Sequence, residues 1–255
     1  MLRSRIIPCL LLHQGGLVKT RQFKEPKYVG DPLNAVKIFN EKEVDELMFI
    51  DIDATAEARE PSIPLLRSLA VESRMPLCYG GGVTSAEQAS RIVATGFEKV
   101  SVSSAALSRP ALIKEMSEAI GSQSVVVTID VKTNRLFSGY TIYTHNGRQK
   151  HKQSLLDFCQ QAVSLGAGEI VINSIDRDGQ MDGYDLKLAR QVRDVIDTPM
   201  TMLGGAGSVD HLQELIDEVG VVGAAAGSMF VFKGQYRAVL INYTRPARLQ
   251  SQDNS

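Results

Sequence analysis

The sequence predicts a single (β/α)8 barrel of the TIM-barrel class. Short apolar runs alternate with longer amphipathic segments along the whole chain, and repeated strand–helix units form a parallel sheet with right-handed crossovers. The apolar runs carry little internal polar alternation, as expected of strands that are covered on both faces. Eight such units in 255 residues fit a closed barrel, for which roughly 250 residues is typical. The alternative is an open doubly wound sheet.

The expected elements follow one another in regular order. Eight apolar runs are the predicted strands, at residues 6–12, 46–52, 75–79, 99–102, 124–129, 169–173, 200–203 and 222–225. Amphipathic segments are the predicted helices, at residues 31–42, 61–73, 85–94, 110–120, 154–165, 186–196 and 209–218. The first helix begins with Asp31-Pro32, an N-cap followed by proline at the first helical position.

An internal repeat supports the barrel. Five residue pairs are separated by 123 positions: Glu46/Glu169, Asp53/Asp176, Gly81/Gly204, Gly82/Gly205 and Ser85/Ser208. Each pair occupies the same place in the second and sixth strand units or in the loops after the third and seventh strands. We therefore expect a barrel over residues 1–245 made of half-barrels at about 1–120 and 121–245. A polar, frayed tail is expected from Arg245, with residues 246–255 outside the barrel.

The segment 135–152 interrupts the strand–helix rhythm. Residues 141–144 read as a strand, and Asn146-Gly147 after them is the signature of a hairpin with a two-residue turn. We expect a flexible excursion after the fifth strand, on the rim where barrel enzymes place their lids.

Composition excludes several classes of protein. Lys+Arg 28 against Asp+Glu 29 gives a net charge of −1, which removes the electrostatic argument for nucleic acid as the main partner. No apolar run approaches the roughly 18 residues that a membrane span needs. Cys9, Cys78 and Cys159 are far apart, and no His or Cys spacing suggests a disulfide framework, a metal site or a cofactor. We expect a cytosolic protein.

Glycines and hydroxyls recur after paired strands and predict two anion sites. The first set follows the third and fourth strands, and the second set follows the seventh and eighth: Gly81, Gly82, Ser103 and Ser104, then Gly204, Gly205, Gly227 and Ser228. Neighbouring strands would bring backbone N–H groups and a hydroxyl to one point, which suits phosphate. A ligand with a phosphate at each end would span both sites. The alternative is that these glycines only permit tight turns.

Carboxylates also gather where the predicted strands end. Asp130 ends the fifth strand and is the best candidate for proton transfer. Asp51 follows the second strand, and Asp176 and Asp178 follow the sixth. A capping role is the alternative for Asp130, and an Asx turn is equally consistent with residues 176–179.

Charged residues also mark the opposite ends of the strands. Arg5, Glu46, Lys99 and Glu169 begin the first, second, fourth and sixth strands. If their side chains point inward, they form a ring of ion pairs across the barrel floor. Residue type and position alone favour a stabilising plug.

Taken together, the motifs resemble the cyclase subunit of imidazole glycerol phosphate synthase, over nearly the whole chain up to about Phe232. The matching segments include Arg5-Ile-Ile-Pro-Cys-Leu10, Gly16-Leu-Val-Lys19, Gly80-Gly-Gly82, Lys99-Val-Ser101, Tyr143-Thr-His145, Gly166-Ala-Gly-Glu169, Ser174-Ile-Asp-Arg-Asp-Gly179 and Gly204-Gly-Ala-Gly-Ser208.

The resemblance implies a barrel with two phosphate sites, to which Asp178 and Gly179 belong and for which Lys19 is a further candidate. It also implies a glutaminase partner (HisH-like) on the N-terminal face of the barrel, which supplies ammonia for a lyase and cyclisation step of histidine biosynthesis. The four floor residues match the family's ammonia gate, so a gated passage replaces the plug as our interpretation. No cofactor is implied.

The chain departs from this family at the reacting end. The family uses one Asp at the end of strand 1 and one at the end of strand 5, and this chain has Leu11 and Asp130 at those positions. Leucine cannot transfer a proton. Leu203 also replaces a small polar residue, and Ser103-Ser104 stands where Asn-Thr is usual.

Leu10-Leu-Leu12, Lys24-Glu-Pro-Lys-Tyr-Val-Gly-Asp31 and Cys78-Tyr-Gly-Gly81 resemble a paralogous branch linked to acetamidino modification of nucleotide-activated sugars in surface polysaccharide. That branch is associated with a separate amidotransferase.

Three hypotheses about function follow. The chain is an ammonia-channelling subunit for sugar amidation, a histidine-pathway cyclase in which Asp51, Asp176 or His13 replaces the missing acid, or a non-catalytic scaffold that docks a glutaminase.

Overall fold

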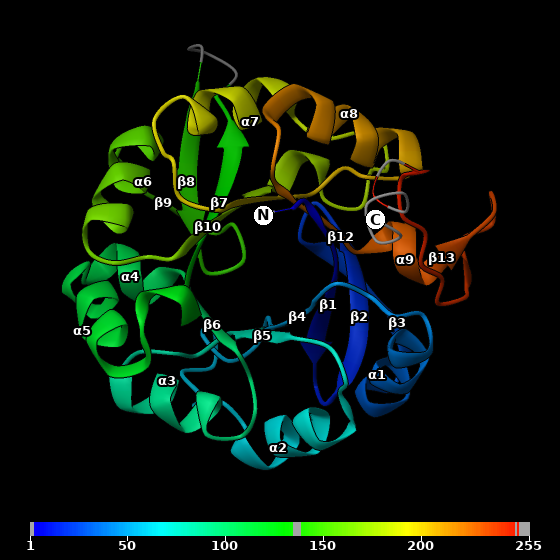
Figure 1. Cartoon of the computed structure of the whole chain (residues 1–255), viewed down its shortest axis with the longest axis horizontal. Coiled ribbons are helices and arrows are strands. Elements are labelled where there is room, and N and C mark those ends of the chain that lie inside the picture. Colours follow the sequence, from blue (N-terminus) through cyan, green and yellow to red (C-terminus); the bar gives the residue numbers. More distant parts are fainter. Residues whose placement is uncertain (1–2, 135–138, 248, 250–255) are drawn as a thin grey trace.

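The chain forms a closed parallel barrel with its helices on the outside (Figure 1). The computed structural model describes residues 3–134, 139–247 and 249. Its barrel strands are β1 (Arg5–His13), β4 (Leu47–Asp51), β5 (Leu77–Gly80), β6 (Lys99–Val102), β7 (Val125–Thr133), β10 (Glu169–Ser174), β11 (Met200–Leu203) and β12 (Gly223–Ala226). Each strand pairs in parallel with the next, and β12 pairs with β1. The predicted fold class is confirmed.

The helices cover the outside of the barrel, and each predicted helix is present. They are α1 (Pro32–Glu41), α2 (Ile63–Glu72), α3 (Ala86–Val93), α4 (Ser104–Ser108), α5 (Ala111–Ile120), α6 (Leu155–Ser164), α7 (Leu186–Arg193), α8 (Val209–Val219) and α9 (Ser228–Val231), with 3₁₀ turns η1 (Ser122–Ser124) and η2 (Ile175–Arg177). The hydroxyls of Ser85 and Ser208 accept hydrogen bonds from the third residue of α3 and of α8. One pair of the sequence repeat therefore caps two equivalent helices.

Two hairpins extend the barrel at the carboxyl ends of its strands. β2 (Gly16–Arg21) and β3 (Lys24–Gly30) form one that sequence analysis did not predict. β8 (Tyr140–Thr144) and β9 (Gln149–Lys150) form the one that was predicted, although its connection spans residues 145–148 rather than two. His145, Asn146 and Gly147 all have positive φ, which lengthens the turn. Residues 135–138 of the expected excursion lie outside the described residues.

The apolar core has two layers. The alternation along β1 sends Ile6 and Leu10 outward against the helices, whereas Ile7 and Cys9 point into the barrel. The interior cluster is completed by residues from the other strands, namely Met48, Cys78, Val126, Val171 and Ala225, with Leu11, Ile50 and Leu203 packed on it. The interior is thus a narrow apolar column between two polar ends.

The C-terminal segment takes a path that differs from a regular eighth helix. After the short α9 comes a two-stranded hairpin, β13 (Phe232–Lys233) and β14 (Ala238–Val239). The chain then reaches the barrel floor, where the Tyr243 hydroxyl donates to Ile6 O at 3.1 Å and accepts from Asp45 N at 3.3 Å. Arg245 pairs with Asp45 at 3.0 Å, and Leu249 is buried. The frayed tail expected from Arg245 is therefore wrong for its described residues.

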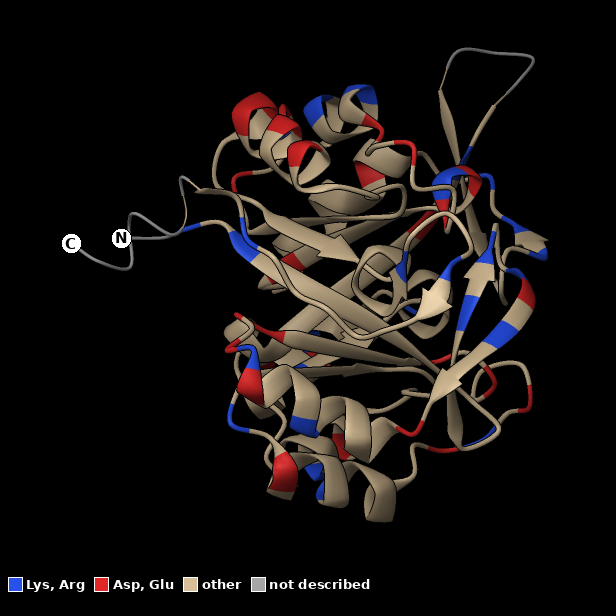
Figure 2. Cartoon of the chain, turned by 90° about the vertical axis from the view of Figure 1, so that its right-hand side faces the viewer, with Lys and Arg blue, Asp and Glu red and all other residues tan. Residues whose placement is uncertain are grey.

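Figure 2 shows helices that carry both acidic and basic residues. Among the described residues, no helix is both long enough and apolar enough to cross a membrane.

Candidate functional site

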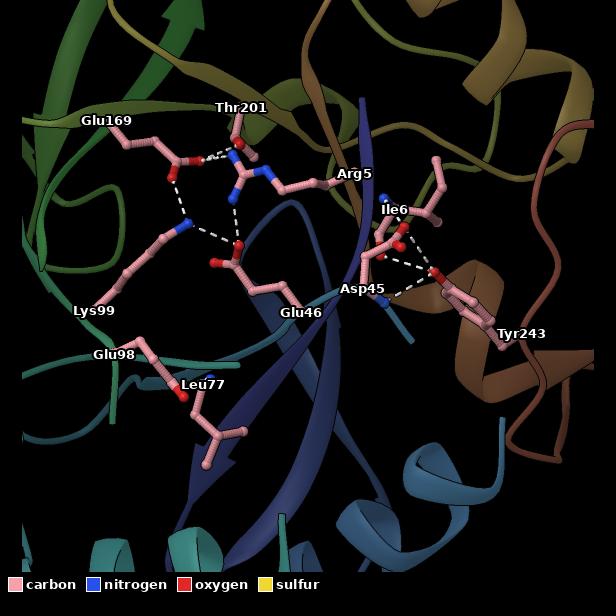
Figure 3. Close-up of polar contacts among 10 residues, drawn as sticks. All are labelled: Arg5, Ile6, Asp45, Glu46, Leu77, Glu98, Lys99, Glu169, Thr201 and Tyr243. Carbon is pink, nitrogen blue, oxygen red and sulfur yellow. Dashed lines mark hydrogen bonds and ion pairs between the residues drawn. The ribbon is translucent and has the colours of Figure 1, made fainter. Parts of the chain in front are cut away.

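The barrel floor carries a closed cycle of ion pairs (Figure 3). Arg5 contacts Glu46 and also donates from Nη2 to Glu169 Oε1 at 2.8 Å. Lys99 Nζ donates to Glu46 Oε2 at 2.7 Å and to Glu169 Oε2 at 2.8 Å. Each charged group therefore contacts both groups of opposite charge. The structure brings all four predicted gate residues together with their side chains turned inward.

Burial and charge oppose each other in this cycle. Removal from water alone would raise the pKa of Glu169, but Arg5 and Lys99 outweigh burial and hold it below its usual range. Burial would lower the pKa of Lys99, yet the two glutamates raise it. The Thr201 hydroxyl also donates to Glu169. The mutual attraction of opposite charges therefore favours the ionised forms of Lys99 and Glu169, and the groups at the floor are held together by ion pairs rather than by apolar packing.

The column above the floor is a cluster of buried apolar side chains. Cys9 and Cys78 belong to it, and burial raises the pKa of the Cys9 thiol to about 11 and that of Cys78 well above its ordinary value. One polar pair lies on its wall, where the hydroxyls of Ser101 and Thr128 are 2.7 Å apart. Apolar side chains of this kind offer little to hold an ion.

A cavity of about 570 Å3 opens at the carboxyl ends of the strands. It brings together the first predicted phosphate set, namely Gly81, Gly82, Ser103 and Ser104, and joins them to Leu11, Asp51 and Asp130. The positive φ of Gly81 lets its backbone pass close to that of Asp51, because a Cβ at Gly81 would lie 2.4 Å from Asp51 O.

Asp130 is a titratable group in the wall of this cavity. Burial raises its pKa to about 7, although a hydrogen bond from Asn173 Nδ2 at 2.9 Å opposes that rise and nearby Asp178 adds to it. A carboxyl with such a pKa can accept or donate a proton near neutral pH. The structure places Leu11, from β1 on the opposite side of the barrel, in the wall of the same cavity.

The other candidate acids are engaged elsewhere. Asp51 lines the main cavity, but its Oδ1 accepts from Asp53 N at 3.0 Å and from Ala54 N at 2.9 Å. Asp176 accepts from Thr133 N at 2.7 Å and lines neither cavity described here. His13 Nδ1 lies 2.8 Å from Asp53 Oδ1, and His13 also lines neither cavity.

A second cavity, of about 40 Å3, adjoins the first. It gathers the second predicted set of Asp178, Gly179, Gly204, Gly205, Gly227 and Ser228 together with Lys19. Lys19 is buried, donates to Cys9 O, and has its pKa lowered by burial. The carboxylate of Asp178 accepts from the Thr20 hydroxyl at 2.6 Å and from Phe23 N at 3.1 Å, so it fixes the tip of the β2–β3 hairpin.

The two cavities share one wall. Leu11, Phe23, Asn173 and Leu203 line both. Sequence reasoning missed Phe23 and Asn173. The Asn173 amide lies on β10 beside Asp130 on β7, which the paired strand register places opposite each other, and that register was the signal that could have found it. Phe23 gives no such signal, since it sits at positive φ in a hairpin tip without glycine.

Within the described part of the chain, no group of three or more His, Cys, Asp or Glu side chains is arranged to hold a metal ion. The cysteines Cys9, Cys78 and Cys159 are free and buried.

Comparison with known proteins gives consistent matches. The model of a family described as "Histidine biosynthesis protein" matches residues 5–237. A Leptospira borgpetersenii protein, provisionally named imidazole glycerol phosphate synthase subunit HisF, is 53% identical over 243 residues, which is 95% of this chain and 96% of that protein. A Vibrio vulnificus protein, provisionally named subunit hisF3 of the same synthase, is 53% identical over 247 residues, 97% of this chain and 95% of that protein.

More distant relatives carry the same name without a qualifier. The imidazole glycerol phosphate synthase subunit HisF of Lysinibacillus sphaericus is 39% identical over 246 residues, which is 96% of this chain and 97% of that protein. Both the family model and these relatives span almost the whole barrel. The chain therefore belongs to the histidine biosynthesis protein family and is a homologue of the HisF subunit of imidazole glycerol phosphate synthase.

Proposed function

We propose that this chain is the ammonia-receiving barrel subunit of a glutamine-dependent complex and that it has lost efficient imidazole-ring formation. A glutaminase subunit (HisH-like) docks on the floor, where Arg5, Glu46, Lys99 and Glu169 gate the passage. The ammonia then serves the amidation of a nucleotide-activated sugar, forming an acetamidino group for surface polysaccharide, in concert with a separate amidotransferase.

One observation carries the proposal: the two ends of the barrel differ. The floor keeps its complete cycle of four charges, and the column above it is narrow and apolar. At the other end, Leu11 occupies the wall of the cavity in which Asp130 is the proton-transfer candidate. A positioned acid or base contributes about 10²–10⁴-fold to a rate. A leucine at one of the two positions should therefore slow ring formation strongly, whereas it leaves the four residues of the floor in place for ammonia transport.

A second candidate function is the cyclase step itself, in which a phosphorylated ribulosyl-formimino substrate is converted to imidazole glycerol phosphate and AICAR. The pKa of Asp130, raised to about 7, favours this candidate, because one group with that pKa can act as both acid and base. Asp51 is the one replacement acid of the three considered that lines the same cavity. A scaffold that only docks a glutaminase is the third reading.

A histidine auxotroph that lacks its own cyclase separates the first two candidates. We expect no growth without histidine when the auxotroph expresses this chain, and growth when it expresses Leu11→Asp. Robust growth on the unaltered chain would establish the cyclase and reject the loss of ring formation.

Stimulation of a HisH-like glutaminase by the barrel tests the proposed gate at the floor. Addition of the barrel should raise glutamate formation from glutamine, and Lys99→Met should reduce that stimulation. Lys114→Met is the matched control, since Lys114 pairs with Glu118 on the exposed face of α5. If the barrel gives no stimulation, or if both variants behave alike, the gate assignment is wrong.

The proposed role in sugar amidation is tested by deletion of the gene. Deletion of the gene should remove acetamidino groups from the surface polysaccharide, as detected by mass spectrometry, and should leave growth without histidine intact. A deletion strain with unaltered polysaccharide that fails to grow without histidine would overturn this part of the proposal.

A scaffold that only docks a glutaminase gives a different result in the coupling experiment. It would still stimulate the glutaminase but would tolerate Lys99→Met.

A further inference from the structure

Arg237, in the hairpin that follows α9, contacts two residues that line the second cavity. Its Nη1 donates to Gly179 O at 3.1 Å, and its Nη2 donates to Ser228 Oγ at 3.3 Å. Gly179 and Ser228 both line that cavity. The guanidinium therefore lies beside two residues of the cavity wall without lining the cavity itself, although Arg237 is more than forty residues beyond Asp178 and Gly179 and follows β12.

The guanidinium is held in place by its own hairpin. Arg237 has φ +49°, and its N–H donates to Gly234 O at 3.0 Å, which closes the turn between β13 and β14. Its Cζ lies 4.7 Å from the centre of the Phe232 ring, and Lys27 Nζ lies 5.0 Å from the same ring. Lys27 also donates to Arg237 O at 3.3 Å. Stacking on a ring and a fixed turn reduce the entropy lost when such a side chain binds a ligand.

Basic side chains outnumber acidic ones beside the second cavity. Lys19 and Arg237 are the basic groups, Arg21 lies beside Gly179, and Asp178 is the carboxyl group that acts on both Lys19 and Arg237. Burial lowers the pKa of Arg237, the charge of Arg21 lowers it further, and Asp178 opposes both. No ion pair of Arg237 is found among the described residues. Arg59 in the main cavity differs, because it pairs with Glu57 and with Asp51.

The Arg237 guanidinium keeps N–H donors that its hydrogen bonds to Gly179 and Ser228 do not use. A guanidinium has five N–H donors, and the two hydrogen bonds of Arg237 described above use two of them. The Ser228 hydroxyl accepts from Arg237, so its own hydrogen is free to point into the cavity. Gly204 and Gly205 have positive φ, and a Cβ on either would lie 2.7 Å or less from a backbone oxygen, so the wall opposite is bare backbone.

From these contacts we infer that Arg237 is a direct ligand of a phosphate dianion in the second cavity. The guanidinium supplies charge-assisted hydrogen bonds to the phosphoryl oxygens and orients the Ser228 hydroxyl toward them. The hairpin β13–β14 is thus part of the binding site. This inference rests on the proposed function, whose cyclase candidate takes a phosphorylated substrate, for the assignment of the cavity to phosphate, and it adds a residue that contributes charge to the site.

Titration with inorganic phosphate at pH 8, followed by calorimetry, tests the inference. Ser104→Asp places a carboxylate in the main cavity, and binding that persists in this variant reports on the second cavity. In that background, Arg237→Gln should weaken phosphate binding by about tenfold or more, as expected for a lost charge-assisted hydrogen bond. Arg237→Lys should be intermediate, because lysine keeps the charge and loses the two-pronged geometry.

Lys233→Gln is the matched control. It removes an exposed cation from β13 of the same hairpin without touching the cavity, so affinity should change by less than about twofold once salt screens distant charges. Phosphate should also raise the unfolding temperature of the Ser104→Asp protein more than that of its Arg237→Gln derivative, which separates lost binding from a loosened hairpin.

Two failures can be told apart. If Ser228→Asp abolishes the second phosphate site while Arg237→Gln binds normally, Arg237 is only a latch for the hairpin and this inference is wrong. If neither Ser104→Asp nor Ser228→Asp changes phosphate binding, both cavities have been misassigned and the phosphate element of the proposed function falls with them.

Discussion

Leu11 on β1 and Asp130 on β7 line the same cavity, and Leu11 also lines the smaller cavity beside it. The family resemblance places a carboxylate at each of these two positions. The opening at the carboxyl ends of the strands therefore has an ionisable side chain, Asp130, on one side and an apolar side chain, Leu11, on the other. Leu11 also helps to form the wall between the two cavities.

Leu11→Asp should restore a proton-transfer pair. We expect ring-forming activity to rise by about 10²-fold or more, measured with an ammonium salt as the nitrogen source so that the glutaminase plays no part. Leu11→Asn is the control, since it has a similar volume to the aspartate but cannot transfer a proton. Equal activity of the two variants would show that polarity or space at this position matters and acid–base chemistry does not.

Asp130 should make the stability of the protein depend on pH in a defined direction. Its pKa is about 7 in the folded state against 3.8 for the free group, so the folded state binds a proton more tightly than the unfolded chain. The associated stability is fully present below about pH 4 and is lost as the pH rises to 7.

Urea unfolding of wild type and Asp130→Asn checks this. Between pH 5 and pH 8, the free energy of unfolding of the wild type should fall relative to Asp130→Asn by up to about 3 kcal/mol, at about 1.4 kcal/mol per pKa unit. A difference between the two proteins that stays constant with pH, or that grows in the opposite direction, would contradict the raised pKa.

Lys99→Met should destabilise the fold as well as the coupling. The substitution leaves Glu46 and Glu169 with Arg5 alone, and an incompletely paired buried charge costs about 3 kcal/mol or more. Denaturant unfolding of Lys114→Met, at an exposed pair on α5, should shift by no more than about 0.5 kcal/mol. Similar midpoints for the two variants would mean that the floor cycle contributes nothing to stability.

The thiols should be inert in the folded protein. Cys9, Cys78 and Cys159 are buried, and burial raises the pKa of Cys9 to about 11 and that of Cys159 to about 12. Since the thiolate is the reactive form, a disulfide reagent at pH 8 should titrate no thiol in the native state and three after unfolding. Rapid reaction of Cys9 or Cys78 in the native protein would indicate a barrel interior wide enough to admit the reagent.

The barrel could be predicted because its signals are local. Each strand is a continuous apolar run, and each helix has a face of apolar residues and a recognisable cap such as Asp31 or Ser85. The hairpin β2–β3 was missed because its turn uses Gln22 and Phe23 at positive φ, where glycine or asparagine is the usual signal. The course of residues 228–249 depends on tertiary contacts, of which the bonds of Tyr243 to Asp45 and Ile6 are the clearest.

Site residues could be predicted where their position along a strand determines which end of the barrel they face. Residues that begin a barrel strand face the floor and residues that end one face the mouth, so Lys99 and Asp130 could be placed from the sequence. The burial that raises the pKa of Asp130, the bonds that occupy Asp51, and the approach of Arg237 to Ser228 could not. Each depends on segments that are far apart in the chain and that meet only after the barrel has closed.

The double contacts of the floor cycle have an electrostatic consequence. If the ammonium group of Lys99 moves away, both glutamates keep Arg5 as a partner, and neither carboxylate is left without a counter-charge. The planar guanidinium that spans the two acids thus joins the negative half of the cycle independently of the more flexible lysine chain.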